Sequence, residues 1–305
     1  MNADNLTVSF RNNDLSPRDL ISSLQSLYDS REPEVLAFIP EPNRFERLLN
    51  DAEELVKKYP DVNSRPALFG MTLGVKDIFH VDGFVTQAGS KLPAEDIQGK
   101  EATSVTQIKN AGALVMGKTV TTEFAYFTPG PTRNPHNPSH TPGGSSSGSA
   151  AAIGAGMCNL TLGTQTIGSV IRPAAFCGAV GFKPTYERIS RASNVDTVKQ
   201  VASVLVENWR IGELETTTRK PTLGIPEGPY LSCASDYALA CFNDLCNILA
   251  QAGYNIRRVQ IMDNFQDIRD RHDAIMSFDA SQVHKDWFAK HEILYSSKFS
   301  DLIKR

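Results

Sequence analysis

Residues 141–191 constrain the fold of this chain more than any other stretch. Residues 143–148 read Gly-Gly-Ser-Ser-Ser-Gly, a set of small residues that tolerates the backbone angles of a tight turn. Residues 149–156 are small, mostly apolar and compatible with a helix, and residues 160–162 follow as a short buried strand. A second turn is predicted over residues 163–169. Because this order of elements lets the chain fold back, we expect the two turns to lie close together.

The two turns carry hydroxyl groups, and the helix between them has end signals of its own. Ser149 is the predicted N-cap of this helix and Gly156 its predicted C-cap. Folding back would bring Ser145 of the first turn close to Ser169 of the second. A flexible glycine and serine linker is the alternative interpretation. A linker does not need the apolar residues that follow, so a packed structure is favoured.

Three blocks of this stretch resemble the signature of the amidase signature family. They are Gly143-Gly144-Ser145-Ser146 with Gly148-Ser149-Ala150-Ala151-Ala152, Gly163-Thr164 with Thr166 and Gly168-Ser169, and Arg172-Pro173-Ala174-Ala175-Phe176-Cys177-Gly178. The resemblance extends upstream to Gly74-Val75-Lys76-Asp77 and Gly117-Lys118-Thr119, and it continues more weakly from Pro221. A composite motif of this length is specific, and a chance match is therefore disfavoured.

The resemblance implies a catalytic triad of Lys76, Ser145 and Ser169, with Ser145 in a cis peptide. The implied reaction is hydrolysis of a carboxamide or urea-type C–N bond of a small-molecule substrate through an acyl-enzyme. Ser169 attacks the carbonyl carbon, and Ser145 takes the proton of Ser169 and relays it to neutral Lys76. Ser145 later returns a proton to the leaving amine. The resemblance implies no metal ion and no organic cofactor.

The turn around Ser169 is the implied oxyanion hole, and it departs from the family at three positions. The implied donors are the backbone N–H groups of Thr166, Ile167, Gly168 and Ser169. Ile167 stands where the family most often has a small residue, and Gln165 stands where an aspartate is usual. Arg172 comes one residue later than the usual arginine. We interpret the departures at Gln165 and Arg172 as coupled: the ion pair usual in the family is exchanged for another arrangement. The departures bear on the substrate class more than on the reaction chemistry.

Lys76 has a second reading that does not depend on the resemblance. A Lys-Asp dipeptide such as Lys76-Asp77 is usually a surface pair of little energetic value. Here it follows residues 68–75, which read as a strand that enters the core. A lysine at the end of such a strand is desolvated, and desolvation favours the neutral form of the amine. A neutral lysine can act as a base.

Two other motifs suggest different enzymes. Residues 112–119 match the P-loop pattern GxxxxGK[ST], but the four residues between its glycines are Ala, Leu, Val and Met, which read as a strand. Nucleotide binding is therefore not expected. Ser146 lies in a GxSxG pattern typical of a nucleophile elbow, which needs a strand directly before it. The proline-rich residues 128–142 precede this pattern instead, and their prolines also exclude a helical His136–His140 metal site.

The composition argues for a globular protein without a nucleic-acid or membrane partner. The chain has 305 residues, of which 41% are hydrophobic and 21% charged, and its net charge of −3 does not favour binding to polyanions. The first residues lack the pattern of a signal peptide, and no apolar run approaches the roughly 20 residues of a membrane helix. Five cysteines without a CxxC pair indicate reduced thiols, so a cytoplasmic location is expected. Assembly into a homo-oligomer is left open.

The predicted fold is α/β, with a mixed central sheet covered by helices on both faces. A single amidase signature domain is expected over residues 1–305, with N-terminal helices in 1–65, a catalytic core in 66–192 and a partial remainder in 193–305. We expect the C-terminal part of the family's fold to be missing. A helix is expected to begin at Pro17 and to carry the apolar face of Leu20, Ile21, Leu24 and Leu27. The other elements expected outside the motif are helices over 43–58, 103–110, 194–208 and 236–251, strands over 113–116, 222–225 and 255–259, and polar helices over 263–305.

Two alternatives to a free-standing amidase remain. One is the glutaminase-type A subunit of a tRNA-dependent amidotransferase, which shares the implied triad and releases ammonia for a partner. The other is a truncated, non-catalytic chain that keeps the motif but lacks a complete pocket. Glutaminase activity that rises with a partner would favour the first, and a folded chain without amide turnover would favour the second.

Overall fold

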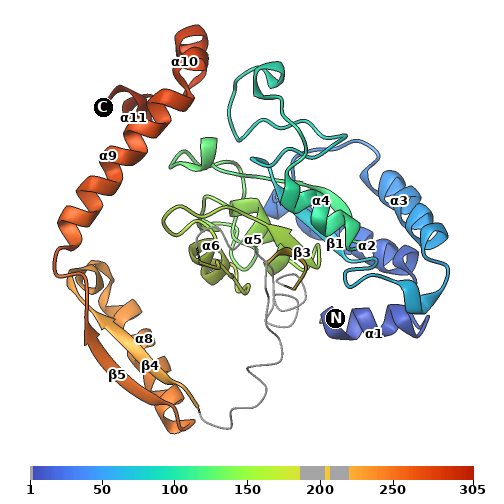
Figure 1. Ribbon diagram of the computed structural model, residues 1–305, viewed down its shortest axis with the longest axis horizontal. Helices are drawn as coiled ribbons and strands as arrows, with labels where there is room; N and C mark the ends of the chain where they lie inside the picture. Colours follow the sequence, from blue (N-terminus) through green and yellow to red (C-terminus); the bar gives the residue numbers. More distant parts are fainter. Residues whose placement is uncertain (1–2, 186–202, 207–219) are drawn as a thin grey trace. The chain divides into compact units, whose positions relative to one another are not determined.

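The structure is a computed structural model that describes residues 3–185, 203–206 and 220–305 (Figure 1). The chain divides into two compact units. The first unit contains Met1–Trp209 and Asp286–Asp301, and the second contains Arg210–Lys285 and Leu302–Arg305. The assignment of residues 1–305 to a single domain stays a prediction.

The first unit contains a three-stranded parallel sheet. Its strands are β1 (Thr72–Lys76), β2 (Leu114–Thr119) and β3 (Leu160–Leu162), and their order is β2-β1-β3. The predicted α/β class is confirmed. The sheet is less mixed than expected: among the described residues, the antiparallel component of this sheet is one isolated bridge between Phe38 and Thr119.

One face of this sheet is covered by α4 (Thr103–Asn110), which lies between β1 and β2 in the chain. Val105 and Ile108 of this helix share a core with Leu73 and Val75 of β1. These four side chains are fully buried. In β1 the apolar side chains that face α4 alternate with residues of the opposite face, as the period of a strand requires.

The other face is covered by α2 (Pro17–Val35), α3 (Arg44–Lys58) and α5 (Ser147–Gly154). Their side chains enclose Met116 of β2 in a second core, so helices cover both faces of the sheet, as predicted. The start of α2 follows the expected signals: Ser16 is the N-cap of a capping box with Asp19, and Pro17 opens the helix.

The predicted N-cap of α5 is wrong. The N-cap residue is Ser146, three residues earlier, so the helix begins at Ser147 and Ser149 lies inside its first turn. The hydroxyl of Ser149 donates to the carbonyl of Leu162 at 2.9 Å, because α5 packs directly onto the sheet. This packing is tight at Gly148, where an added Cβ would lie 2.1 Å from the carbonyl oxygen of Ala37. The predicted C-cap is one residue too late: Ala155 is the C-cap, and Gly156 follows it with φ +74°, a left-handed conformation that favours glycine.

The remaining described elements of the first unit are short, and one segment from the end of the chain packs among them. Ser296 donates its backbone N–H to Glu123 Oε1 at 3.0 Å, and Tyr295 stacks on Phe124. These elements are α1 (Ala3–Arg11), η1 (Val62–Ser64), η2 (Ala94–Ile97), η3 (Glu123–Ala125), α6 (Ile171–Phe176), α10 (Lys285–His291), η5 (Glu292–Leu294) and the start of α11 (Ser297–Lys304).

The second unit is built from a strand, a helix and a parallel strand. β4 (Thr222–Glu227) pairs with β5 (Asn255–Gln260), and α8 (Asp236–Gln251) joins them after the short η4 (Pro229–Cys233). α9 (Phe265–Val283) follows. The predicted strands and helix downstream of Pro221 are thereby confirmed. The helix predicted over 194–208 lies outside the described residues, apart from 203–206.

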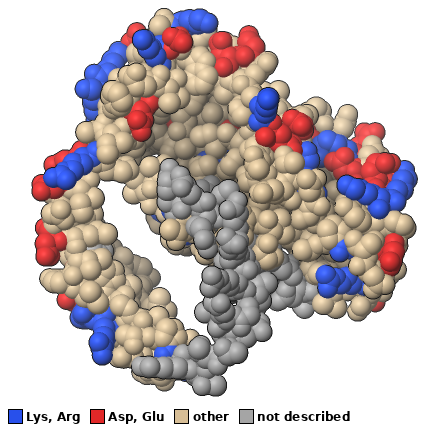
Figure 2. Space-filling view, viewed as in Figure 1, with Lys and Arg blue, Asp and Glu red and all other residues tan. Residues whose placement is uncertain are grey.

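Two observations bear on the surface of the described residues. No helix among them is both long enough and apolar enough to cross a membrane. On the face shown in Figure 2, the basic and acidic side chains that are described are interspersed. This distribution agrees with the small net charge of −3.

Candidate active site

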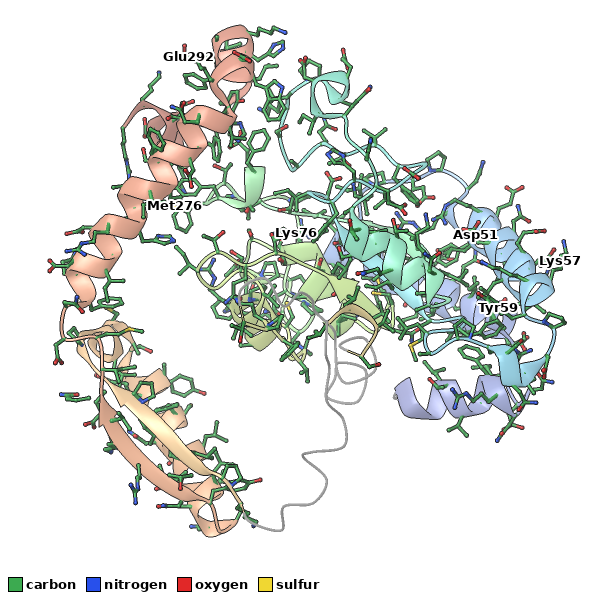
Figure 3. All side chains as sticks on the ribbon, viewed as in Figure 1. Asp51, Lys57, Tyr59, Lys76, Met276 and Glu292 are labelled. Atoms are coloured by element: carbon green, nitrogen blue, oxygen red, sulfur yellow. The ribbon has the colours of Figure 1, made fainter. Side chains whose placement is uncertain are left out.

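Lys76 lies at the carboxyl end of β1 and is fully buried. Its Nζ atom lies 2.8 Å from Ser145 Oγ and 2.7 Å from Thr164 Oγ1. Figure 3 shows Lys76 in the interior of the first unit, whereas Asp51 and Lys57 point outward from α3. The surface interpretation of the Lys-Asp dipeptide is therefore excluded, and the amine is placed against two hydroxyl groups.

Hydrogen bonds to the backbone carbonyls of Gly144 and Ser145 fix Ser145 in the turn before α5. The Gly144–Ser145 peptide bond is cis, as the resemblance implies. The carbonyl of Ser145 accepts a hydrogen bond from Thr122 N at 3.2 Å. The guanidinium of Arg172 donates to the carbonyl of Gly144 from Nε at 3.1 Å and from Nη2 at 2.6 Å. The displaced arginine thus fixes the peptide unit that carries Ser145.

Ser169 lies in the loop that joins β3 to α6. Its carbonyl accepts a hydrogen bond from the backbone N–H of Ser146 at 3.1 Å. The two turns are therefore adjacent, as the order of elements predicts. The structure brings Lys76, Ser145 and the loop of Ser169 together at the carboxyl end of the sheet.

Hydrogen bonds to its backbone carbonyl groups hold the loop around Ser169 in place. The carbonyls of Ile167, Gly168 and Ser169 accept hydrogen bonds at 3.0, 2.9 and 3.1 Å. The backbone N–H groups of Thr166, Ile167, Gly168 and Ser169 donate to none of the residues that the structure describes. Four consecutive unpaired N–H groups beside a serine can stabilise a developing negative charge.

Gln165 and Arg172 do not replace the usual ion pair with another pair. The amide oxygen of Gln165 accepts the backbone N–H groups of Val170 and Ile171, both at 2.9 Å. Its Nε2 donates to the carbonyl of Ile167. The interpretation of the two departures as one exchanged pair is therefore corrected: each side chain binds a different stretch of backbone.

Thr164 is the member of the site that was not predicted from the sequence. It belongs to the quoted Gly163-Thr164 block, so the block itself was the available signal. What could not be read from the sequence is its contact with Lys76, which is 88 residues away in the chain.

Comparisons with known proteins identify the family of this chain. The family model described as Amidase matches residues 37–207, which is more than half of the chain. The chain belongs to the amidase signature family. Among its relatives, the A subunit of the Glutamyl-tRNA(Gln) amidotransferase of Salinibacter ruber is 39% identical over 227 residues, which are 68% of this chain and 43% of that protein. The corresponding protein of Thermus thermophilus is 39% identical over 204 residues, covering 62% of this chain and 41% of that one. The chain thus spans less than half the length of these two relatives.

Solved structures of amidases share the fold. The peptide amidase of Stenotrophomonas maltophilia matches with a TM-score of 0.76 and 23% identity, over 96% of this chain and 68% of that chain. A bacterial aryl acylamidase of the amidase signature enzymes matches with a TM-score of 0.81 and 18% identity, over 100% of this chain and 72% of that one. At such identities the likeness shows the fold alone.

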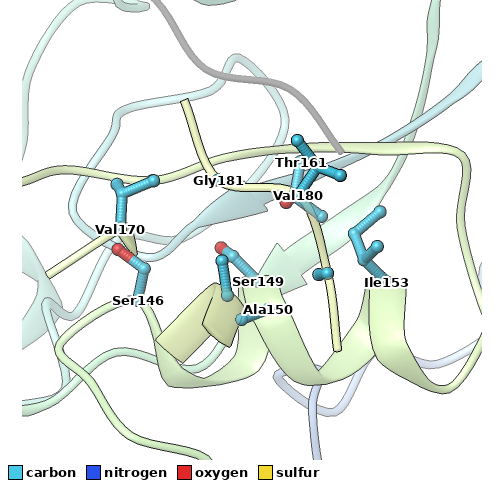
Figure 4. A pocket seen from close by; sticks show the side chains of 11 residues that line it. Ser146, Ser149, Ala150, Ile153, Thr161, Val170, Val180 and Gly181 are labelled. Atoms are coloured by element: carbon cyan, nitrogen blue, oxygen red, sulfur yellow. The ribbon is translucent and has the colours of Figure 1, made fainter. Parts of the chain in front are cut away.

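Ser146 is not placed as a nucleophile. Its side chain is buried, and its Oγ donates to the carbonyl of Thr164 and accepts from Thr164 N, both at 3.2 Å. Together with Ser149, Thr161 and Val170, it lines a cavity of about 30 Å³ (Figure 4). A cavity of that size holds roughly one water molecule. No strand precedes Ser146 directly, so the nucleophile-elbow hypothesis is not supported.

Lys118 does not belong to a phosphate-binding loop. Residues 114–119 form β2, and Lys118 makes a buried ion pair with Asp77, with Nζ 2.7 Å from Oδ1. It also donates to Thr86 Oγ1 at 2.9 Å. Burial raises the pKa of the Asp77 carboxyl and lowers the pKa of the Lys118 amine, and each charge partly offsets the effect on the other. The P-loop pattern is thus a strand with a structural lysine.

The histidines and cysteines of the described residues form no recognisable second centre. His136 Nε2 lies 2.9 Å from the carbonyl of Cys177, and His140 contacts Ser139. No group of three or more potential metal ligands occurs among the residues that the structure describes. The thiols of Cys158 and Cys177 are buried, and burial raises the pKa of each to about 12, which makes both unreactive as nucleophiles.

Proposed function

We propose that this chain hydrolyses a carboxamide or urea-type C–N bond of a small molecule. Ser169 is the nucleophile, Ser145 relays its proton, and Lys76 is the base. The distance of 2.8 Å between Lys76 Nζ and Ser145 Oγ, at a fully buried lysine, is the observation that supports this most. A buried amine between two hydroxyl oxygens can accept a proton from a serine without a histidine.

The proposed reaction assigns one step to each of these three groups. Neutral Lys76 accepts the proton of Ser145, which in turn takes the proton of Ser169 as its Oγ bonds to the substrate carbonyl carbon. The carbonyl oxygen becomes an oxyanion, and the N–H groups of residues 166–169, which have no partner among the described residues, stabilise it. One such donor is worth roughly 3–4 kcal/mol. The proton then returns through Ser145 to the leaving nitrogen, and water hydrolyses the acyl-enzyme.

Kinetics of four alanine variants test this proposal. Ammonia release would be followed over a panel of aliphatic carboxamides, aromatic carboxamides, glutamine and urea. Ser169→Ala is expected to abolish turnover, while Ser145→Ala and Lys76→Ala each lower kcat/KM by about 10²- to 10⁴-fold. The Lys76→Ala/Ser145→Ala double variant should be little worse than either single variant, because the two groups act as one unit.

Ser146→Ala is the matched control, because Ser146 is a buried serine next to Ser145. It should retain most of the activity. If Ser146→Ala abolishes turnover and Ser169→Ala retains it, the roles proposed for these serines are wrong. A folded chain that turns over none of the panel would favour the non-catalytic alternative.

The second candidate function is that of a glutaminase component of a larger enzyme. The identity of 39% to the amidotransferase A subunit of Salinibacter ruber favours it. Such a chain would release ammonia from glutamine for a partner. Glutaminase activity that rises when the other components of such an amidotransferase are added would support it. An equal rate with and without them, together with turnover of other amides, would favour the free-standing amidase.

A further inference from the structure

Ile167 is a large apolar side chain that is exposed in the turn of Ser169. It is 62% exposed, whereas Val170, one residue after the proposed nucleophile, is buried. Neither Ile167 nor Gly168 has a positive φ angle, so the backbone of the turn accepts a side chain at either position without strain. A single exposed apolar residue is ordinary on a protein surface. This one is distinguished by its place, two residues before Ser169.

The space beside the turn is open at Gly168. Apart from its two chain neighbours, a Cβ added to Gly168 would meet one atom of the described residues within 4 Å, the Cβ of Arg172 at 3.8 Å. The backbone N–H groups of residues 166–169 also have no partner among the described residues. The turn therefore offers free donors together with room for a substrate beside them.

Covalent geometry brings Ile167 close to any carbonyl group that these donors bind. The Cβ atom of Ile167 is two bonds from its own backbone nitrogen and three bonds from the nitrogen of Gly168. A carbonyl oxygen about 2.9 Å from either nitrogen lies within roughly 6 Å of this Cβ. The side chain extends about 2.5 Å further, which is enough to reach the groups attached to the carbonyl carbon.

The proposed reaction indicates which of these groups Ile167 meets. The leaving nitrogen has to face Ser145, because Ser145 returns the proton to it. Ser145 and Lys76 are both buried, so the leaving nitrogen lies toward the buried side of the site. The acyl group is attached on the other side of the carbonyl carbon. It therefore lies toward the exposed side chains of the turn, Thr166 and Ile167, of which only Ile167 is wholly apolar.

We propose that Ile167 is a specificity-determining residue that contacts the acyl group of the substrate and limits its width next to the carbonyl carbon. Branching at Cβ restricts χ1 of isoleucine, so the side chain does not readily rotate away. The preferred substrates are unbranched aliphatic amides and planar urea-type compounds, and amides with a fully branched α-carbon are excluded. The inference rests on the hydrolytic function proposed above and extends it to the substrate class.

Kinetics of Ile167→Ala over a graded series of amides test this role. The series is acetamide, propanamide, 2-methylpropanamide and 2,2-dimethylpropanamide, which differ in the number of methyl groups on the α-carbon. The ratio of kcat/KM between variant and unmodified protein removes the intrinsic reactivity of each amide. This ratio should be near one for acetamide and should rise about tenfold or more for 2,2-dimethylpropanamide. Ile167→Val should give intermediate ratios.

Ile275→Ala is the matched control. Ile275 of α9 is the same residue with the same exposed fraction of 62%. Its ratio should be near one for all four amides. An equal ratio for all four amides in Ile167→Ala would overturn the inference, because a side chain that only stabilises the turn affects every substrate alike.

Labelling of Ser169 separates this inference from the proposed function. Two fluorophosphonates would be compared that share one alkoxy group and carry either a methyl or a tert-butyl group on phosphorus, in place of the acyl group. Ile167→Ala should raise the labelling rate of the tert-butyl reagent relative to the methyl reagent by about tenfold. Labelling of Ser169 with an unchanged relative rate would overturn the inference alone. If the unmodified protein neither labels at Ser169 nor releases ammonia from any of the amides, the proposed function fails and the inference fails with it.

Discussion

The buried ion pair between Asp77 and Lys118 gives the sharpest prediction about stability. The two side chains are 2% and 3% exposed, and Lys118 also donates to Thr86 Oγ1 and to the carbonyl of Val85. Lys118→Met would leave the carboxylate of Asp77 with two backbone hydrogen bonds, from Gln87 N at 3.3 Å and from Gly89. Removing one partner of a buried pair costs about 3–5 kcal/mol, because the other charge stays buried without compensation. We expect Lys118→Met to lower the free energy of unfolding of the first unit by this amount.

The pH dependence of this loss has a definite sign. Burial raises the pKa of Asp77 even with Lys118 present, and loss of the lysine raises it further. A carboxyl whose pKa is raised by folding contributes stability below its unfolded pKa of ~3.9 and loses that contribution as the pH rises through its folded pKa. The deficit of Lys118→Met should therefore be largest at neutral pH and shrink as the pH falls.

The assay compares Lys118→Met with the double variant Asp77→Asn/Lys118→Met. Urea unfolding followed by circular dichroism would be combined with hydrogen exchange in β1 and β2, because the two units of the chain need not unfold together. The double variant should recover most of the lost stability, since no charge remains buried. Either of two results would contradict this prediction: a loss below about 1 kcal/mol for Lys118→Met, or a double variant that is less stable than the single one.

Three further predictions follow from the packing and the surface. Gly148→Ala should prevent accumulation of folded protein, because the new Cβ would lie 2.1 Å from the backbone oxygen of Ala37. Gly224→Ala is the control: its Cβ would meet its nearest atom at 3.6 Å, so the variant should keep its melting temperature. Equal melting temperatures of the two variants would contradict this prediction. Calorimetry should detect no ATP binding at micromolar concentrations, and measurable affinity would revive the P-loop interpretation. The second unit carries apolar side chains with large exposed fractions, such as Tyr237 (81%) and Phe278 (63%). The chain should therefore self-associate or bind a hydrophobic dye. A monomer in sedimentation that binds no dye would argue against this.

Local patterns predicted those elements whose residues impose a conformation by themselves. Ser16 and Pro17 mark the start of α2, and alternating apolar residues mark β1, whereas a continuous apolar run marks β2. The start of α5 was misplaced at Ser149 because a serine that caps a helix and a serine that packs on a sheet look alike in the sequence. Only the position of the neighbouring strand distinguishes them, and that position is set by contacts between distant residues.

In the candidate site, too, contacts between distant residues could not be predicted from local patterns. The pairing of Lys76 with Ser145 joins residues 69 positions apart, and no periodicity could have indicated it. The family resemblance supplied that expectation, and the geometry agrees with it. The contact of Thr164 with Lys76 and the backbone bonds of Gln165 were not foreseen, because they depend on side-chain directions within a loop.

The identity of the serine that a fluorophosphonate modifies is the decisive measurement for the proposed mechanism. The purified chain would be labelled, digested and analysed by mass spectrometry, with Ser169→Ala and Ser146→Ala treated in parallel. We predict one modified serine, Ser169, with labelling lost in Ser169→Ala and retained in Ser146→Ala. Modification of Ser146 in place of Ser169, or undiminished labelling of the Ser169→Ala variant, would show that the mechanism is wrong.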